Sequence, residues 1–387
     1  MRPLAPETGV KALFFAYFAM IGAISPYLAL YFADVGLSIS QIGILVALPP
    51  VMRIIGPPFW GALADRSGRR GPLLRASSAA AIVLAVGIWL AGSHFAVLLA
   101  LIALLQFATS AQSPLGESMA VSVAAGDAGR YGRMRLWGSV GFTGGVVLMG
   151  PLLDWLGVSG LPLLLALLAS AVFAVTWRLP EVAAPRPAAG VPVWGRLREP
   201  AIAAFFASCF LMMFAHAALY AFYSLHLYGF GYSKTFIGLA WTIGVLAEIV
   251  VFRVQKRLFD RFGALPLLAA SFIAAALRFA LIGWGGGALA VVVVAQLLHA
   301  ITFGVHHSAV MALLHRWFGP AEQGRAQAMY ITLGYGLGGA SGGIVASRLW
   351  EHVGPAAAFH GAAIAAALGW GAVALCRRLD YARASEA

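Results

Sequence analysis

The sequence predicts an all-α membrane protein with twelve transmembrane helices, arranged as two pseudo-symmetric bundles of six. Two observations lead to this prediction. Hydrophobic residues make up 61% of the 387 positions and charged residues only 10%, so a water-soluble protein would have too little polar surface to cover itself. The turn Asp65-Arg66-Ser67-Gly68 also recurs as Asp260-Arg261-Phe262-Gly263, 195 residues later, which indicates an internal duplication.

The apolar runs are each roughly 20 residues long, enough to cross a hydrocarbon layer of about 30 Å as a helix. Helices are expected because the alternating pattern of barrel strands is absent and lipid cannot hydrogen-bond to an open backbone. In chain order the predicted spans are residues 10–32, 41–63, 72–92, 95–120, 136–156, 160–179, 201–227, 234–255, 265–284, 288–314, 326–347 and 356–376.

The spans group into two predicted domains. An N-terminal bundle occupies residues 1–180 and a C-terminal bundle residues 200–387. Residues 181–199 between them are rich in proline and alanine and carry charge, so we expect a linker on the cytoplasmic side.

Glycines spaced four residues apart occur in both halves. In the first half they are Gly141 and Gly145, and in the second half Gly334, Gly338 and Gly342. Such spacing places the glycines on one helix face, where the absence of side chains lets two backbones approach. We therefore predict close helix packing at these positions.

The basic residues predict the orientation. Lys234 and Arg348 fall outside the cell and Arg53 and Arg278 fall within spans, while the rest of the 26 Lys and Arg residues lie on the side assigned to the cytoplasm. This asymmetry follows the positive-inside rule. We therefore expect a multi-pass protein of the inner (cytoplasmic) membrane, with both termini in the cytoplasm and the lipid bilayer as its surroundings.

The net charge of +12 would be compatible with nucleic-acid binding, but its distribution excludes that function. The basic residues are scattered over several short segments rather than gathered on one face, so we expect no nucleic-acid partner. We expect the protein to act as a monomer.

No cofactor, metal or enzyme activity is expected. Cys209 and Cys376 lie in different predicted spans and are interpreted as small buried hydrophobic residues, so neither a disulfide nor a metal site is predicted. The sequence contains no Walker loop, Gly-rich dinucleotide turn, His-Glu-x-x-His or Cys-x-x-Cys motif. ATP-driven transport is therefore not expected either.

Charged residues within or at the inner edge of the spans are candidates for function. Each costs about 2.5–3.5 kcal/mol at bilayer depth, so each needs a partner or a role. The 195-residue offset aligns Arg53 with Glu248, and each lies about 18 Å along its helix from the loop aspartate. We expect these two to pair, either as a static salt bridge or as a pair that breaks and reforms. The other two such residues are Glu117 and Arg278.

Two proline pairs flank the first of these charges. Pro49-Pro50 and Pro57-Pro58 lie on either side of Arg53. Because each proline removes a backbone donor, we predict a helix that is broken twice, which favours the pair that breaks and reforms.

Glu117 and Arg135 lie at facing ends of the fourth and fifth spans, on either side of a short turn. An antiparallel helix hairpin brings such positions within reach of each other. Two interpretations remain open: the pair binds the substrate, or it joins the two helices at the inner membrane edge.

Aromatic side chains concentrate in the first and seventh spans. Those near the span ends are explained by interfacial belts, and the others offer apolar surface that, with a buried guanidinium, suits an aromatic or otherwise apolar carboxylate. The aromatic residues of the two spans are Phe14, Phe15, Tyr17, Phe18, Tyr27 and Tyr31, then Phe205, Phe206, Phe210, Phe214, Tyr220, Phe222 and Tyr223.

The charged turn resembles the loop between the second and third helices of major facilitator superfamily transporters. The matching residues are Gly61, Asp65, Arg66, Gly68, Arg69 and Arg70, and the second, degenerate copy keeps Asp260 and Arg261. The resemblance implies the twelve-helix fold of that superfamily and identifies these residues as a gating loop.

A second block is similar to lactose permease. Gly132-Arg133-x-Arg135-x-x-Gly138 and the eighteen-residue separation of Glu117 and Arg135 match its sugar-binding hairpin. The match to the phenylpropionate permease branch is closer, through Pro26-Tyr27, Met52-Arg53, Arg135-Leu-Trp-Gly-Ser and Leu297-Leu298-His299.

These resemblances imply roles for named residues. Glu117, Arg135, Tyr27, Arg53 and His299 would contact substrate, and His299 matches a histidine of the permease's proton-coupling network. The permease carries an acid where this chain has Thr302, so we predict Glu248 as proton carrier, with Arg278 or Arg53 as its cation. His216, His226, His306 and His307 are interpreted as interfacial or packing residues.

The sequence therefore predicts a secondary transporter that takes up a small aromatic or other organic acid with protons, by alternating access. The alternatives are a proton-coupled sugar or nucleoside symporter, a drug efflux transporter, and a membrane sensor that has kept the fold without transport.

Overall fold

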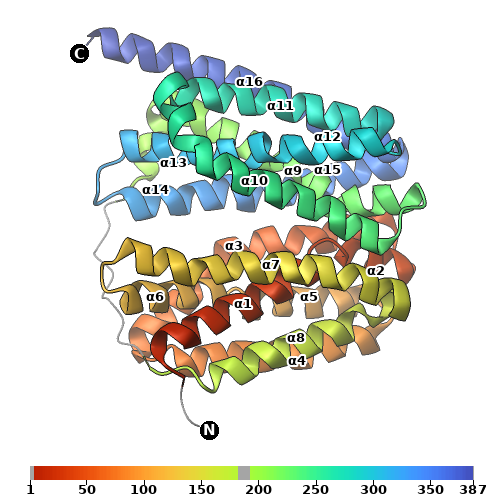
Figure 1. Cartoon of the computed structure of the whole chain (residues 1–387). Helices are drawn as coiled ribbons and strands as arrows, with labels where there is room; N and C mark the ends of the chain where they lie inside the picture. Colours follow the sequence, from red (N-terminus) through yellow and green to blue (C-terminus); the bar gives the residue numbers. More distant parts are fainter. Residues whose placement is uncertain (1–3, 182–191, 387) are drawn as a thin grey trace. The chain divides into compact units, whose positions relative to one another are not determined.

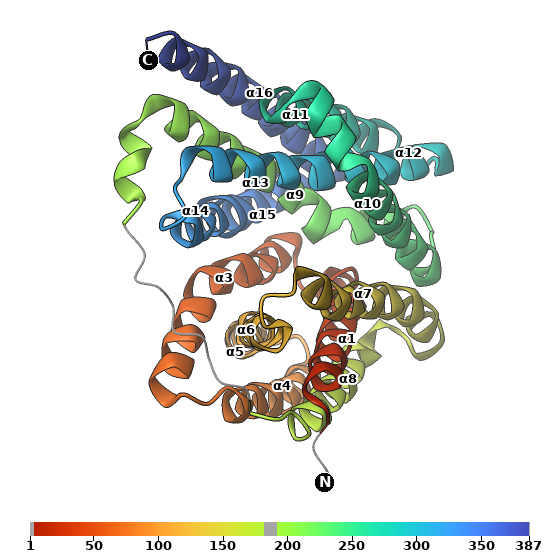
Figure 2. The same ribbon diagram turned by 60° about the vertical axis from the view of Figure 1, so that its left-hand side comes forward.

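The computed structural model describes residues 4–181 and 192–386, and these residues form helices and no strands (Figures 1 and 2). The chain divides into two units. Unit 1 comprises Met1–Pro187 together with Gly231–Leu239, and unit 2 comprises Ala188–Phe230 together with Ala240–Ala387. Most of the predicted linker, residues 181–199, lies outside the described residues, so its boundaries stay a prediction.

The described residues of the first unit form the eight helices α1 to α8 and the first residues of α10. Its elements are α1 (Pro6–Ile24), α2 (Leu28–Asp34), α3 (Ile39–Ser67), α4 (Gly71–Ala91), α5 (Phe95–Thr109), α6 (Gln112–Ala124), α7 (Ala128–Leu156), the 3-10 turn Val158–Gly160, and α8 (Leu161–Thr176).

The second unit repeats long helices and adds two π-helical segments. Its elements are the 3-10 turn Trp194–Arg198, α9 (Pro200–Gly229), α10 (Lys234–Phe262), α11 (Ala264–Gly285), α12 (Leu289–His299), a π-helix (Ala300–Val305), α13 (His306–Trp317), α14 (Gln323–Tyr330), a second π-helix (Ile331–Gly338), α15 (Gly339–His352) and α16 (Pro355–Glu386).

Eleven helical segments in the described part of the chain are long and apolar enough to cross a membrane. They correspond to eleven of the twelve predicted spans. The remaining one, residues 326–347, is helical through α14, the second π-helix and α15, but its many glycines make it less apolar. The all-α membrane fold is therefore confirmed.

Prolines act differently at two places in unit 1. The predicted first span, 10–32, is interrupted by a turn at residues 25–27, because Pro26 has no N–H to donate and the Tyr27 N–H bonds the Ile24 carbonyl three residues back. The prediction that α3 is broken twice is wrong, since Ile39–Ser67 is one helix despite the four prolines inside it. Each proline removes a single donor, and the remaining backbone bonds continue through it.

Glycines allow α1 and α7 to pack closely along unit 1 (Figure 1). A Cβ atom at Gly141 would overlap the carbonyl oxygen of Phe15, and one at Gly145 would overlap that of Ala19. Gly22 of α1 meets the Phe142 carbonyl in the same way. The predicted packing role of this glycine pair is confirmed.

The second unit repeats this arrangement between α9 and the helix that ends in α15. Cβ atoms at Gly338 and Gly342 would overlap the carbonyl oxygens of Phe210 and Phe214, and Gly334 faces the Cys209 carbonyl at 3.4 Å. Backbone contact thus replaces side-chain packing at the same kind of position in both units.

The first turn of α10 belongs to unit 1 because Asp154 of α7 binds it. The Asp154 carboxylate accepts hydrogen bonds from the backbone N–H groups of Lys234 (3.0 Å) and Thr235 (2.9 Å) and from the Thr235 hydroxyl (2.6 Å). Ser233 accepts from the next N–H, that of Phe236. Helix N-termini leave such donors unsatisfied, and here a residue of another helix satisfies two of them.

We expect Gly145→Ala to lower stability by about 1–3 kcal/mol, because the added methyl group forces α1 and α7 apart. Gly144→Ala is the matched control, since no atom lies within 4 Å of a Cβ at that position. Thermal unfolding of the purified proteins in detergent measures both. Equal midpoints for the two variants would contradict the close-packing argument.

Candidate functional site

Glu117 and Arg135 meet across the α6–α7 hairpin of unit 1. The turn has Ala125 and Gly126 at positive φ, 51° and 88°, and Asp127 caps α7 by accepting from the Arg130 N–H at 3.0 Å. This bond is the main cause that lowers the pKa of Asp127. The hairpin brings Arg135 Nε to 3.0 Å from Glu117 Oε1, so the predicted proximity of the two is confirmed.

Further side chains complete this cluster. The Tyr131 hydroxyl donates to the second Glu117 oxygen at 2.6 Å. The Arg135 guanidinium lies over the Phe18 ring at 4.4 Å and 5.8 Å from that of Phe14. A Cβ at Gly138 would be 2.6 Å from Arg135 Nη1, so this glycine provides room for the guanidinium. The pair is charge-balanced, and about a third of each side chain is exposed.

Two other predicted substrate residues of unit 1 have different surroundings. Tyr27 is 0% exposed, and its hydroxyl donates to the carbonyls of Val146 (3.3 Å) and Lys234 (3.1 Å). These contacts favour a packing role over the predicted contact with substrate. Arg53 is exposed and lies, like Arg135, within electrostatic range of the Tyr17 hydroxyl. Because Arg53 belongs to unit 1 and Glu248 to unit 2, their pairing stays a prediction.

Arg278 of α11 is the centre of the polar cluster of unit 2, and its side chain is fully enclosed. Its Nη1 donates to His299 Nδ1 (3.1 Å) and to Thr302 Oγ1 (3.0 Å), and its Nη2 donates to Gln296 Oε1 (3.3 Å). An arginine is always a donor, so His299 Nδ1 accepts and the ring carries its proton on Nε2.

Glu248 of α10 lies next to the cluster, and His299 is the cluster residue nearest to its carboxylate. Its Oε2 lies 3.9 Å from His299 Nε2, and no arginine or lysine lies within 4.0 Å of this carboxylate among the described residues. The predicted direct pairing of Arg278 with Glu248 is therefore wrong in this structure. The imidazole of His299 lies between the two charges, since it contacts the guanidinium with one nitrogen and the carboxylate with the other.

Sequence reasoning missed three members of this cluster. Thr302 takes the place of the expected acid and contacts His216 Nε2 at 3.3 Å, while His216 Nδ1 donates to the Met212 carbonyl at 3.0 Å. His216 is thus part of the polar network and more than a packing residue. Gln296 is the third. The available signal was a polar side chain in the middle of an apolar span, which the sequence offers for His216 and Gln296.

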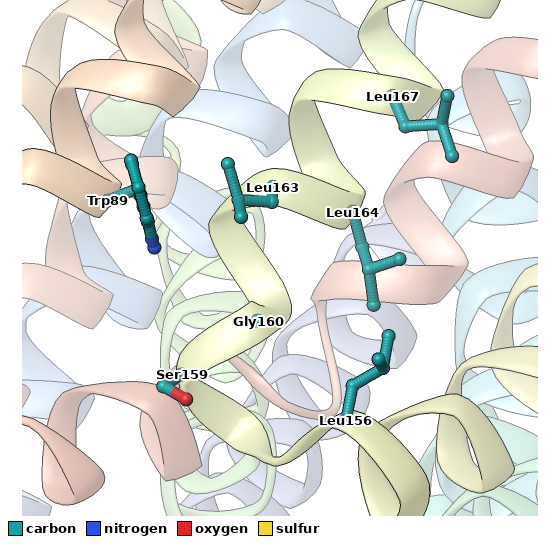
Figure 3. Close-up of a pocket in the computed structure, with 7 residues that line it drawn as sticks. All are labelled: Trp89, Leu156, Ser159, Gly160, Leu163, Leu164 and Leu167. Atoms are coloured by element: carbon teal, nitrogen blue, oxygen red, sulfur yellow. The ribbon is translucent and has the colours of Figure 1, made fainter.

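A pocket of about 460 Å³ lies elsewhere in unit 1 and is apolar (Figure 3). Trp89 of α4 and leucines of α8 contribute most of its lining, and Ser159 contributes a hydroxyl. No charged side chain lines this pocket, so it offers no group to bind an anion or carry a proton. Its residues are Trp89, Leu156, Ser159, Gly160, Leu163, Leu164 and Leu167.

Residues 8–361 match the sequence model of the MFS_1 like family. The chain belongs to this family. It is accordingly a multi-pass membrane protein of the major facilitator superfamily, and its relatives are transporters rather than enzymes.

Two relatives match most of this chain. The probable 3-phenylpropionic acid transporter of Escherichia coli (strain K12) is 29% identical over 346 residues, 88% of this chain and 90% of that protein. The maltose permease of Geobacillus stearothermophilus is 30% identical over 341 residues, 86% of this chain and 85% of that protein.

Solved structures share the fold at lower identity. The nucleoside transporter NupG has a TM-score of 0.83 and 17% identity, covering 97% of this chain and 99% of that chain. The human organic anion transporter MFSD10 has a TM-score of 0.63 and 18% identity, covering 96% of this chain and 100% of that chain. At these identities the likeness establishes the fold alone.

The charged loops that follow α3 and α10 both place a glycine at positive φ. Gly68 and Gly263 both have positive φ, 64° and 77°, which accounts for glycine at the repeated position. In the first loop, Arg70 is 4% exposed and donates to Ser122 Oγ at 3.4 Å. Burial lowers the pKa of Arg70, and the nearby Asp65 and Glu181 carboxylates oppose this shift.

We expect Asp65→Asn to slow transport several-fold with little change in substrate affinity, because it removes a charge that stabilises buried Arg70 rather than a substrate contact. Asp260→Asn is the comparison variant, since Asp260 pairs with exposed Lys256 of its own helix at 2.6 Å and should matter less. Uptake rates in vesicles and equilibrium binding distinguish the two effects. Unchanged uptake by Asp65→Asn would refute the predicted gating role of this loop.

Proposed function

We propose that this protein is a secondary active transporter of the inner membrane that takes up a small organic acid together with protons. The cycle is alternating access, and both termini lie in the cytoplasm. The observation that carries the proposal is the environment of Glu248. Its side chain is 16% exposed within a membrane helix, and a neutral imidazole at 3.9 Å is its partner rather than an arginine or lysine.

Such a carboxyl group is suited to exchange protons. Desolvation favours its neutral form, and no adjacent cation among the described residues holds it permanently ionised. Glu117, the other membrane carboxylate predicted from the sequence, has an arginine as its partner instead: Arg135 lies at 3.0 Å, and Tyr131 donates to its second oxygen. The difference between these two glutamates supports Glu248 as the proton carrier.

An aromatic or other apolar carboxylic acid is the substrate class we favour. The relative named for 3-phenylpropionic acid supports an organic acid, and it is similar over 88% of this chain. The rings of Phe14 and Phe18 beside Arg135 provide apolar surface next to a polar pair. We propose that Glu117 and Arg135 contact the substrate from unit 1.

A sugar is the second candidate, because the maltose permease is as similar as the aromatic acid transporter. A charge-balanced glutamate–arginine pair can bind hydroxyl groups as readily as it can lie beside an acid. Thermal-shift measurements of the purified protein against aromatic acids and disaccharides separate the two candidates. Stabilisation by disaccharides alone would replace the organic acid as substrate.

We expect Arg135→Ala and Glu117→Ala each to weaken substrate binding at least tenfold, because each removes charge-assisted hydrogen bonds worth about 1.5–3 kcal/mol. Arg133→Ala is the matched control, since its side chain is 65% exposed and its acidic partner, Asp127, is 4.0 Å away. Isothermal titration with the stabilising substrate measures all three. Parent-like affinity in either cluster variant would exclude that residue from the site.

We expect Glu248→Gln to abolish uphill uptake driven by a pH gradient and to retain substrate exchange across vesicles, because exchange needs no net movement of protons. Glu322→Gln is the control: this glutamate also belongs to unit 2 and binds Arg196 at 3.4 Å. Full pH-driven accumulation by Glu248→Gln would refute Glu248 as carrier and leave Glu117 as the candidate.

A further inference from the structure

In the part of the chain that the structure describes, Arg278 has no negatively charged partner within 4.0 Å although it is completely buried. The three side chains that accept from it, His299, Thr302 and Gln296, are all neutral. No carboxylate lies within 4.0 Å of its guanidinium among the residues that the structure describes. Arg135 of unit 1 differs, because Glu117 balances its charge directly.

Two N–H donors of this cluster are also unused. Arg278 Nε and the Gln296 side-chain nitrogen are buried and make no hydrogen bond in the described structure. The two side chains are neighbours, since Arg278 Nη2 donates to Gln296 Oε1 at 3.3 Å. A buried charge and buried donors without partners each cost free energy that a suitable ligand would recover.

The surroundings define the chemistry of that ligand. A guanidinium presents parallel N–H groups that match the two oxygens of a carboxylate, and a second amide donor beside it favours the same group. The rings of Tyr220 and Tyr223 lie within electrostatic range of Arg278, and Phe279 lies 5.8 Å from its guanidinium. A carboxylate attached to an apolar or aromatic body satisfies both features.

We propose that Arg278 and Gln296 form the subsite that binds the carboxylate of the transported acid. This inference rests on the proposed function and adds to it, because it names the residues of unit 2 that recognise the anion. The cluster is closed to solvent here, with Arg278 0% exposed, so the anion enters in another conformation of the transport cycle.

The position of Glu248 then links proton binding to anion binding. With Glu248 ionised, its charge balances that of Arg278 through His299; with Glu248 protonated, the cluster keeps one positive charge for the substrate. Among the described residues, the other titratable groups facing the cluster are His216 and the two tyrosines of α9, and His306 lies within electrostatic range of His216. Proton and anion should therefore bind together.

Binding of 3-phenylpropionate and of its neutral amide to the purified full-length protein tests the subsite. We expect Arg278→Gln to weaken binding of the acid at least tenfold and to leave the amide unchanged. Arg278→Lys, which keeps the charge but loses the parallel donors, should fall between Arg278→Gln and the parent. Arg316→Gln is the matched control, because Arg316 pairs with Asp380 at 3.0 Å and is 57% exposed.

The pH dependence provides a second measurement that does not depend on an arginine variant folding. In the parent, affinity for the acid should fall as pH rises, by at most about tenfold per pH unit for one coupled proton. Glu248→Gln mimics the protonated form, so it should bind the acid at least as tightly as the parent and lose this dependence. Affinity for the amide should not vary with pH.

The outcomes separate this inference from the proposed function. If the parent binds the acid and Arg278→Gln or Arg278→Lys binds it equally well, the subsite is refuted and uptake of organic acids stands. A pH dependence unchanged in Glu248→Gln likewise refutes the link to Glu248. If the parent binds the neutral amide as tightly as the acid, or binds neither and responds to sugars, the carboxylate subsite and the organic-acid function both fail.

Discussion

The free-energy cost of keeping a charge away from water determines how the polar side chains of both units are arranged. Unit 1 balances Arg135 with an adjacent carboxylate and covers it with an aromatic ring, so the pair is neutral and partly open to solvent. In unit 2 the side chains that accept from Arg278 are neutral. Glu248 does not contact the guanidinium and lies against the far nitrogen of His299. Removing one partner of the first pair leaves an uncompensated charge, whereas Arg278 has no carboxylate within 4.0 Å among the described residues.

Rigid helix pairs support both clusters. In lipid, apolar surface gains little by leaving one hydrocarbon environment for another, so helices associate through close packing instead. Glycines bring the backbones of α1 and α7 into contact in unit 1, and those of α9 and α15 in unit 2. Arg135 projects from α7 and His216 from α9, so each cluster takes a residue from a helix that its neighbour holds in place.

The sequence was sufficient for the features that depend on local pattern. Apolar length predicts the helices, glycine spacing predicts their contacts, and a short turn between two helices predicts that Glu117 meets Arg135. The partners of Arg278 could not be predicted, because they depend on how α9, α11 and α12 are rotated about their axes. Thr302 lies in the π-helix Ala300–Val305. The direction of its side chain could not be predicted either, because a period of 3.6 residues does not describe a π-helix. Four prolines predicted a broken α3, but tertiary packing and the remaining backbone bonds keep it continuous.

The capping of α10 by Asp154 has a mechanical consequence. This helix begins in unit 1 and continues into unit 2, and its first two N–H groups bind a carboxylate 80 residues earlier in the chain. If the first turn separates from α7, water can replace the carboxylate at those N–H groups and can hydrate Asp154 in turn. Such an exchange conserves the number of hydrogen bonds, so its net cost is small compared with exposing an apolar surface of the same size. The contact between Asp154 and the first turn of α10 can therefore open and close at a lower free-energy cost than an apolar contact of the same size.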